Sequence, residues 1–138
     1  MLSIIIPARN EADNLGDILD YLETNLNKTE FELILVNDFS DDETLTKARK
    51  IFDGKSNLRV IDNDKKGLGG AINKGIKNAK GERIVITMAD LSDNAEDLIK
   101  YNNLMIEKNL DAVLGSRFID GSLVKDYPLQ KLILNRIF

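Results

Sequence analysis

Short apolar runs rich in β-branched residues recur along this chain, and segments with helical hydrophobic periodicity lie between them. The clearest helical segment runs from Leu15 to Leu26, where the apolar residues fall on one face of a helix. Regular alternation of strand and helix predicts right-handed βαβ crossovers and a mainly parallel sheet. Near-continuous apolar strands indicate burial on both faces of that sheet. The sequence therefore predicts an α/β fold with a Rossmann-like sheet and flanking helices.

The predicted elements run up to residue 114. We expect strands at residues 2–6, 31–36, 58–61, 83–88 and 112–114, and helices around residues 15–26, 48–52, 71–79 and 98–106. After residue 114 the pattern changes, because residues 115–128 resemble a loop and residues 129–138 have the pattern of an amphipathic helix. Because this helical pattern runs to the last residue of the chain, the sequence predicts an incomplete domain.

The composition excludes several classes of chemistry. The chain has no cysteine and no histidine, so a thiolate nucleophile, a zinc-thiolate site and an imidazole base are all absent. A divalent metal would have to bind oxygen ligands, which favours Mg²⁺, Mn²⁺ or Ca²⁺. A formal net charge of -4 argues against a general nucleic-acid partner. The first apolar run is too short for a signal peptide or a membrane span, so we expect a cytoplasmic protein.

Polar residues gather where the predicted strands end. They lie in the segments 7–11, 37–43 and 89–93, and a glycine-rich turn at residues 66–70 precedes the third helix. In open parallel sheets the carboxyl ends of the strands form the ligand-binding edge. The start of the third helix could also face an anion. We therefore expect a binding site at this edge.

Several of these polar residues also fit a purely structural role. Asn10 could cap the first helix, Ser40 with Glu43 fits a capping box, and Asp93 with Glu96 fits another. For Asn10 and Asp93 the two interpretations remain open. Asp38 and Asp90 favour function, because each directly follows a strand and precedes the residues best placed to cap a helix.

Two familiar motifs fail on spacing, and a third lacks the residues that it needs. The run that starts at Asp38 has Glu43 and Arg49 where a calcium-binding EF-hand needs glycine and glutamate. The glycine-rich turn has Ile72 at the third glycine position of a dinucleotide fingerprint, so an oxidoreductase is unsupported. A phosphoacceptor signalling domain lacks its acidic cluster after the first strand, where Arg9 stands.

Four ordered segments carry a family resemblance. SIIIPARNE, ELILVNDFSDDET, GLGGAINKGIKNAKGE and IVITMADLSD resemble family 2 glycosyltransferases of the GT-A fold, especially dolichyl- or polyprenyl-phosphate sugar transferases. The resemblance runs from Leu2 to about Phe118, and Gly115-Ser116-Arg117-Phe118 looks like that subgroup's GSR-aromatic motif. It implies a donor-binding core at residues 1–118. Residues 119–138 would begin the part that faces the acceptor and the membrane.

The resemblance implies a nucleotide-binding set in which the first loop and Asp38 cradle the base and ribose. A proline-fixed loop presents its backbone groups rigidly, and a carboxylate accepts hydrogen bonds from a base N–H. The helix start at the glycine-rich turn would offset diphosphate charge. The residues expected to bind the nucleotide are Pro7, Ala8, Arg9, Glu11, Asp38, Gly67, Gly69 and Ala89.

The metal motif departs from the family pattern. Where the family usually has Asp-x-Asp, this chain reads Met88-Ala89-Asp90, so the first carboxylate is missing. Asp90 could still hold Mg²⁺ or Mn²⁺ with help from Asp93 and from diphosphate oxygens. Asp90 and Arg117 are the expected catalytic residues, because a metal and a cation both offset charge on the departing diphosphate.

Two functions follow from this resemblance. The first is an inverting transferase that moves a hexose from a UDP- or GDP-sugar to an acceptor such as polyprenyl phosphate, at the cytoplasmic face of a membrane. The alternative, motivated by Met88, is a noncatalytic nucleotide-sugar-binding or scaffold module. The apolar stripe within residues 129–138 could touch the membrane, pack on the protein itself or mediate self-association.

Overall fold

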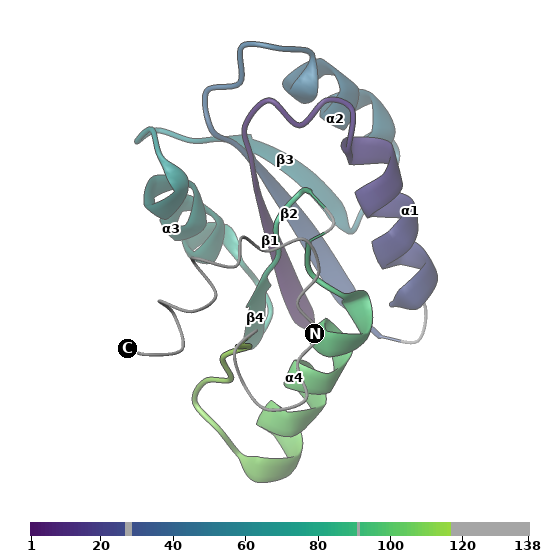
Figure 1. The fold of residues 1–138 in the computed structure, drawn as a ribbon, viewed down its shortest axis with the longest axis vertical. Coiled ribbons are helices and arrows are strands. Elements are labelled where there is room, and N and C mark those ends of the chain that lie inside the picture. Colours follow the sequence, from purple (N-terminus) through teal and green to yellow (C-terminus); the bar gives the residue numbers. More distant parts are fainter. Residues whose placement is uncertain (27–28, 91, 117–138) are drawn as a thin grey trace, which may run out of the picture.

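A computed structural model describes residues 1–26, 29–90 and 92–116 of the chain, and within them strands and helices alternate (Figure 1). The elements are β1 (Leu2–Ala8), α1 (Leu15–Asn25), β2 (Phe31–Asn37), α2 (Thr44–Phe52), β3 (Leu58–Asp62), α3 (Leu68–Asn78), β4 (Arg83–Ile86) and α4 (Ala95–Lys108). The strands form one sheet in the order β3-β2-β1-β4, and every pair is parallel. The predicted α/β fold with a parallel sheet is confirmed.

The helices cover the two faces of the sheet unequally. Helices α1, α2 and α4 pack on one face, where Ile4 and Leu33 are completely buried beneath them. Among the described helices, only α3 covers the other face (Figure 1), where Ile5 and Ile34 are completely buried. Because consecutive strand residues point to opposite faces, β1 and β2 must be apolar at nearly every position.

The predicted fifth strand is wrong. Residues 112–114 adopt no strand in the structure, and the Leu114 side chain is 91% exposed. A strand needs a neighbour to satisfy its backbone groups, and among the described residues none pairs with this segment. A three-residue apolar run was too short a signal to decide the point.

The first strand is longer than the hydrophobic run predicts, because it continues through Pro7 to Ala8. Proline has no N–H, so it is unusual inside a central strand. The carbonyl of Ile5 accepts a hydrogen bond from Thr87, so the backbone groups at this position face β4. The backbone groups of Pro7, two residues later, point to the same side, but β4 has already ended at Ile86. The missing N–H of Pro7 therefore interrupts no strand pairing.

The helix starts also differ from the predicted caps. Helix α1 begins at Leu15, with Asn14 rather than Asn10 at the cap position. Helix α2 has Glu43 at its cap position, and no side chain caps it there. Helix α4 is capped by Asn94, whose side chain accepts a hydrogen bond from the Glu96 N–H. Asn10, Ser40 and Asp93 therefore cap no helix, and their side chains make longer-range contacts described below.

None of the helices in the described part of the chain combines the length and the apolar character that crossing a membrane requires.

Candidate functional site

The ends of the three strands β1, β2 and β3 are tied together at one edge of the sheet. The Asp38 N–H, directly after β2, donates to the Ala8 carbonyl at 2.8 Å. On the other side, the Asn63 N–H donates to the Asn37 carbonyl at 2.9 Å. Parallel pairing thus continues one step past the strands and brings Asp38 and Asn63 side by side. This edge is the one where the sequence placed the binding site.

Asp38 lies at the centre of this edge and is only 5% exposed. Its Oδ1 atom accepts from the Asn63 side-chain amide at 2.7 Å, and the Gly67 N–H donates to both carboxylate oxygens, at 2.9 and 3.0 Å. Among the described residues, Oδ2 accepts from Gly67 alone. Since a carboxylate oxygen has two lone pairs, Oδ2 retains the capacity to accept from a ligand.

The hydrogen bonds from the Gly67 N–H to Asp38 hold the glycine-rich turn in place. Gly67 has φ +113°, a conformation that residues with a side chain rarely adopt, and it stands at the cap position of α3. The Asn63 side chain also bonds the backbone of Lys65 in both directions, which closes the turn. Gly70 packs against the Lys65 carbonyl, whereas the space beside Gly69 is open. The predicted pair Gly67 and Gly69 thus lies at the start of α3, next to Asp38.

The loop after β1 is held by side chains from the loop after β2. The Asn10 N–H donates to Ser40 Oγ at 3.1 Å, Glu11 N–H to Thr44 Oγ1 at 2.8 Å, and Ala12 N–H to an Asp42 oxygen at 3.2 Å. Three consecutive amides therefore already have acceptors, so only the remaining backbone groups of this loop are left to bind a ligand.

Asp42 is exposed just before the start of α2, but its carboxylate is bound by neighbouring groups. It accepts from the Thr44 N–H at 2.9 Å, from the Thr44 hydroxyl and from the Ala12 N–H. Burial by itself raises the pKa of Asp42, but these hydrogen bonds to the charged form outweigh it and hold the pKa below its usual value.

Two residues in these loops have left-handed backbone conformations without being glycine. They are Asn10 with φ +57° and Phe39 with φ +54°. Two hydrogen bonds hold Asn10 in place. Its N–H donates to Ser40 Oγ, and its side-chain oxygen accepts from the Asp41 N–H at 2.8 Å. Phe39 is 44% exposed, beside the buried Asp38. Strained, exposed residues of this kind concentrate at functional sites.

The end of β4 carries the remaining predicted residues. Ala89 is buried, and Asp90 is exposed and accepts a hydrogen bond from the Ser92 N–H at 3.0 Å. One oxygen of Asp93 accepts from the Met88 N–H at 3.0 Å and from the Thr87 hydroxyl at 3.2 Å. The Asp93 side chain therefore holds the loop onto the strand end.

Acidic side chains do not converge on a metal position here. Within residues 1–26, 29–90 and 92–116, no three acidic residues come close enough together to form a cation site. The donors available near β4 fit a hard cation that takes one carboxylate from the protein and its other oxygens from a phosphate and water. Arg117 lies outside the described residues, as does the predicted boundary at residue 118.

Sequence reasoning missed three residues that build this edge. Asn63 directly follows β3, so the same strand-end rule that selected Asp38 could have found it. Thr44 gave no comparable signal, because its partner Glu11 is 33 residues away along the chain. Phe39 was also overlooked, since nothing in a local pattern indicates a left-handed backbone at a phenylalanine.

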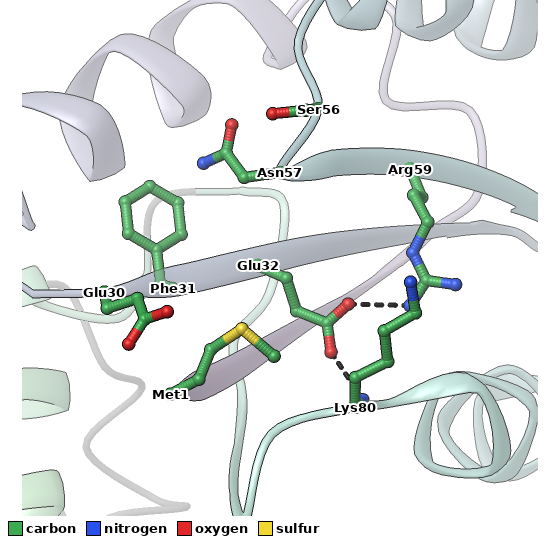
Figure 2. Close-up of a pocket in the computed structure, with 8 residues that line it drawn as sticks. All are labelled: Met1, Glu30, Phe31, Glu32, Ser56, Asn57, Arg59 and Lys80. Atoms are coloured by element: carbon green, nitrogen blue, oxygen red, sulfur yellow. Dashed lines mark hydrogen bonds and ion pairs between the residues drawn. The ribbon is translucent and has the colours of Figure 1, made fainter.

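A hollow of about 240 Å³ lies at the opposite, amino end of the strands (Figure 2). Its charged groups bond one another: Glu32 accepts from Ser3 Oγ at 2.6 Å and from Arg59 at 2.7 Å, and the Lys80 N–H also donates to it. Arg59 donates further to the Asn78 carbonyl at 2.7 Å. This network joins the amino ends of the strands to the α3–β4 connection, and we interpret it as structural.

Glu32 should make stability depend on pH. Burial by itself raises its pKa, but hydrogen bonds from Ser3, Lys80 and Arg59, together with the Arg59 charge, outweigh burial and lower it. A carboxylate with a lowered folded-state pKa stabilises the fold above its unfolded pKa, and the stabilisation is lost as pH falls through the folded value. Denaturant unfolding of wild type and Glu32→Gln should therefore differ most near neutral pH and converge in acid. A constant difference across that range would contradict this prediction.

The fold and the edge described above define a class. A parallel β3-β2-β1-β4 sheet with helices on both faces is the arrangement of a GT-A glycosyltransferase fold. In structural comparison, residues 1–349 of S. aureus TarS in complex with UDP-GlcNAc superpose with a TM-score of 0.66 at 28% identity. The match covers 86% of this chain and 38% of that one. A mannosyltransferase from Pyrobaculum calidifontis in complex with GDP-Man and Mn²⁺ shares the fold, with a TM-score of 0.65 and 24% identity over 75% of this chain and 32% of that one.

The chain belongs to glycosyl transferase family 2, whose sequence model matches residues 3–138. Dolichol-phosphate mannosyltransferase of Pyrococcus furiosus is 32% identical over 136 residues, which cover 98% of this chain and 38% of that protein. Dolichyl-phosphate beta-glucosyltransferase of Dictyostelium discoideum is 33% identical over 148 residues, covering 96% and 45%. The chain thus spans less than half the length of these two relatives.

Proposed function

We propose that this chain forms the donor-binding part of an inverting glycosyltransferase that uses a UDP- or GDP-hexose. The observation that carries the proposal is the convergence of Asp38, the Gly67 turn and the Arg9 loop at one edge of the sheet in a family 2 chain. Relatives named for mannosyl and glucosyl transfer, and fold relatives seen with UDP-GlcNAc or GDP-Man, support a nucleotide-sugar donor.

Each part of this edge has a task in the proposed reaction. The free lone pair of Asp38 Oδ2 accepts a base N–H, while Pro7 and Ala8 hold the adjoining strand end rigid. Arg9 and the open start of α3 beside Gly69 face the diphosphate charge. During transfer the bond from the anomeric carbon to the diphosphate oxygen breaks, and the acceptor oxygen attacks from the opposite side, which inverts the configuration. The leaving diphosphate keeps the electron pair, so stabilising its charge is the main catalytic task.

The metal side of the proposal rests on the loop after β4. Asp90 is the principal carboxylate toward Mg²⁺ or Mn²⁺, and Asp93, which holds the loop at Met88, supports it. A bound cation would supply further positive charge beside the diphosphate. Ala89 is buried next to Asp90, where a small residue lets the backbone of the loop lie close to the strand end. Arg117 is proposed as a second cation on the leaving group.

For the acceptor we propose polyprenyl phosphate at the cytoplasmic face of a membrane, supported by the dolichol-phosphate relatives. Such a phosphate is already ionised at neutral pH, so no general base is required. The alternative is a noncatalytic nucleotide-sugar-binding module. Met88, at the position where the family usually has a carboxylate, favours that alternative. Turnover of a nucleotide sugar by the chain would exclude it.

Calorimetric titration with UDP and GDP, with and without Mn²⁺, tests the proposal directly. We expect one nucleotide to bind, and Mn²⁺ to strengthen its binding about tenfold, as one added charge-assisted contact would. Asp90→Asn should abolish the effect of Mn²⁺ and leave the fold intact. Asp20→Asn, an exposed position on α1, is the matched control and should behave as wild type. If neither nucleotide binds, the proposed function fails; if Mn²⁺ never alters the affinity, only the metal role fails.

A further inference from the structure

We propose that Thr44 is a positioning residue for nucleotide binding, which acts by fixing the loop that carries Arg9 and Glu11. The inference rests on the proposed function, since it concerns the same site. Thr44 lies at the first position of α2 and is completely buried, although it is a polar residue at a helix start. Its hydroxyl is aimed away from its own helix, toward the loop after β1.

The hydroxyl of Thr44 uses both its donor and its acceptor. Oγ1 accepts from the Glu11 N–H at 2.8 Å and donates to Asp42 Oδ1. The other Asp42 oxygen accepts from the Ala12 N–H at 3.2 Å. Thr44 and Asp42 together therefore bind two successive amides of the loop, and removal of the hydroxyl would leave the Glu11 amide without an acceptor in a partly buried position.

The backbone of this loop depends on side chains for its conformation. Residues 9–14 lie between β1 and α1, and the amides of Asn10, Glu11 and Ala12 bond side chains rather than the backbone of a strand or helix. Asn10 holds a left-handed conformation that is uncommon outside glycine. Without the side chains from the second loop, these residues would sample many conformations, and a ligand would have to order them on binding. Thr44 therefore raises affinity by fixing the loop before the nucleotide arrives.

The same bonds decide what the loop can offer a ligand. Because the amides of residues 10–12 already have acceptors, they cannot serve as a cradle for phosphate oxygens. The side chain of Arg9 is exposed beside them and has no hydrogen bond or ion pair with the described residues. Recognition by this loop must then pass through side chains, above all Arg9, whose direction is set by the backbone that Thr44 holds.

The test is a pair of substitutions at one position. Thr44→Val keeps the shape and removes the hydroxyl, whereas Thr44→Ser keeps the hydroxyl. We expect Thr44→Val to weaken binding of the nucleotide selected by wild type about tenfold, and Thr44→Ser to bind within about twofold of wild type. Asp42→Ala is a second variant at an exposed position, so it should fold even if the valine variant does not, and it should also weaken binding.

A general loss of stability must be separated from a loss of positioning. Leu22→Ala, in the buried face of α1 and two turns beyond the loop, is a control that lowers stability and should leave affinity unchanged. Amide hydrogen exchange of the free protein gives an independent readout. The Glu11 amide should be protected in wild type and in Thr44→Ser, and exposed in Thr44→Val.

The outcomes distinguish the two proposals. A wild-type chain that binds neither nucleotide would overturn the proposed function and the positioning role with it. If wild type binds and the folded Thr44→Val binds equally well, the positioning role alone is overturned. Equal loss of affinity in Thr44→Ser and Thr44→Val would also overturn it, because the hydroxyl would then be irrelevant.

Discussion

Gly70→Ala is expected to be among the most destabilising single-methyl additions in this chain. A Cβ atom built on Gly70 would lie 1.8 Å from the Lys65 carbonyl oxygen and 3.2 Å from the Asn63 side-chain nitrogen. Both groups belong to the turn that Asp38 grips, so the backbone itself must move to make room. Overpacking of this kind costs roughly 1–3 kcal/mol and occasionally more, which corresponds to a fall of about 4–12 °C in the unfolding midpoint of a chain this size.

Its matched control is the preceding residue. A Cβ atom on Gly69 would meet nothing within 4 Å, and Gly69 lies in the first turn of α3. Alanine is the better helix former by up to about 1 kcal/mol, so Gly69→Ala should leave the midpoint unchanged or raise it slightly. Differential scanning calorimetry of the two variants measures the contrast. Equal midpoints for both would show that the turn at Lys65 is not packed as described.

Asp38→Ala should produce the largest loss of nucleotide affinity among the strand-end carboxylates. The substitution removes the acceptor for the Gly67 N–H and for the Asn63 amide, and it removes the lone pair that we assign to the base. Loss of a hydrogen bond to a charged group costs roughly 1.5–3 kcal/mol, or about ten- to a hundredfold in affinity. Titration calorimetry with the nucleotide that wild type selects would measure it.

Asp41→Ala is the control for this change. Asp41 is exposed, and its contact to Asn10 uses the backbone N–H rather than the carboxylate. The nucleotide affinity of Asp41→Ala should match that of wild type. Asp38→Asn separates the two tasks of the carboxylate, because asparagine retains one acceptor oxygen for the Gly67 turn and loses the charge. Were Asp38→Ala and Asp41→Ala to bind equally well, Asp38 would not belong to the binding site.

The strands and the buried faces of the helices could be predicted from the sequence. Leu33 and Ile34 lie in a strand buried on both sides, so their consecutive apolar character is itself the signal. Leu15 and Leu22 follow helical spacing and are both buried. These predictions succeeded because burial and local periodicity are read from neighbouring residues. The run at residues 112–114 failed because pairing with another strand is a long-range property that its own composition does not contain.

The loops were predicted less well for a physical reason. Asn10, Ser40 and Asp93 all have the chemistry of a helix cap, and a local pattern assigns that role to them. In the structure each finds a partner elsewhere: Asn10 and Ser40 bond across 30 or 31 residues of sequence, and Asp93 bonds back to the end of β4. The polar groups that could build a site were found, but the pairs that they form were not.

Asp38 shows the same contrast between what a local sequence pattern can predict and what it cannot. Its location at the end of β2 was predictable from the apolar strand before it, and its burial confirms that it belongs to the packed edge. Its grip on Gly67 was not predictable, because it joins residues 29 apart through a turn whose shape depends on Asn63. Strand ends can therefore be located from sequence, while the hydrogen bonds between them require the fold.

The four strands also differ in how far apart their partners lie along the chain, and this sets an order of assembly. β1 joins β2 at seven positions, the first pairing Leu2 with Phe31, whereas it joins β4 at only four, the first pairing Leu2 with Arg83. Bringing β1 and β4 together closes the longer loop, which costs about 0.9 kcal/mol more in chain entropy. Fewer strand-pairing contacts offset that cost. We therefore expect β1, β2 and β3 to form the folding nucleus and β4 to dock later. On that order, the half of the edge that carries Asp38 forms before the half that carries Asp90.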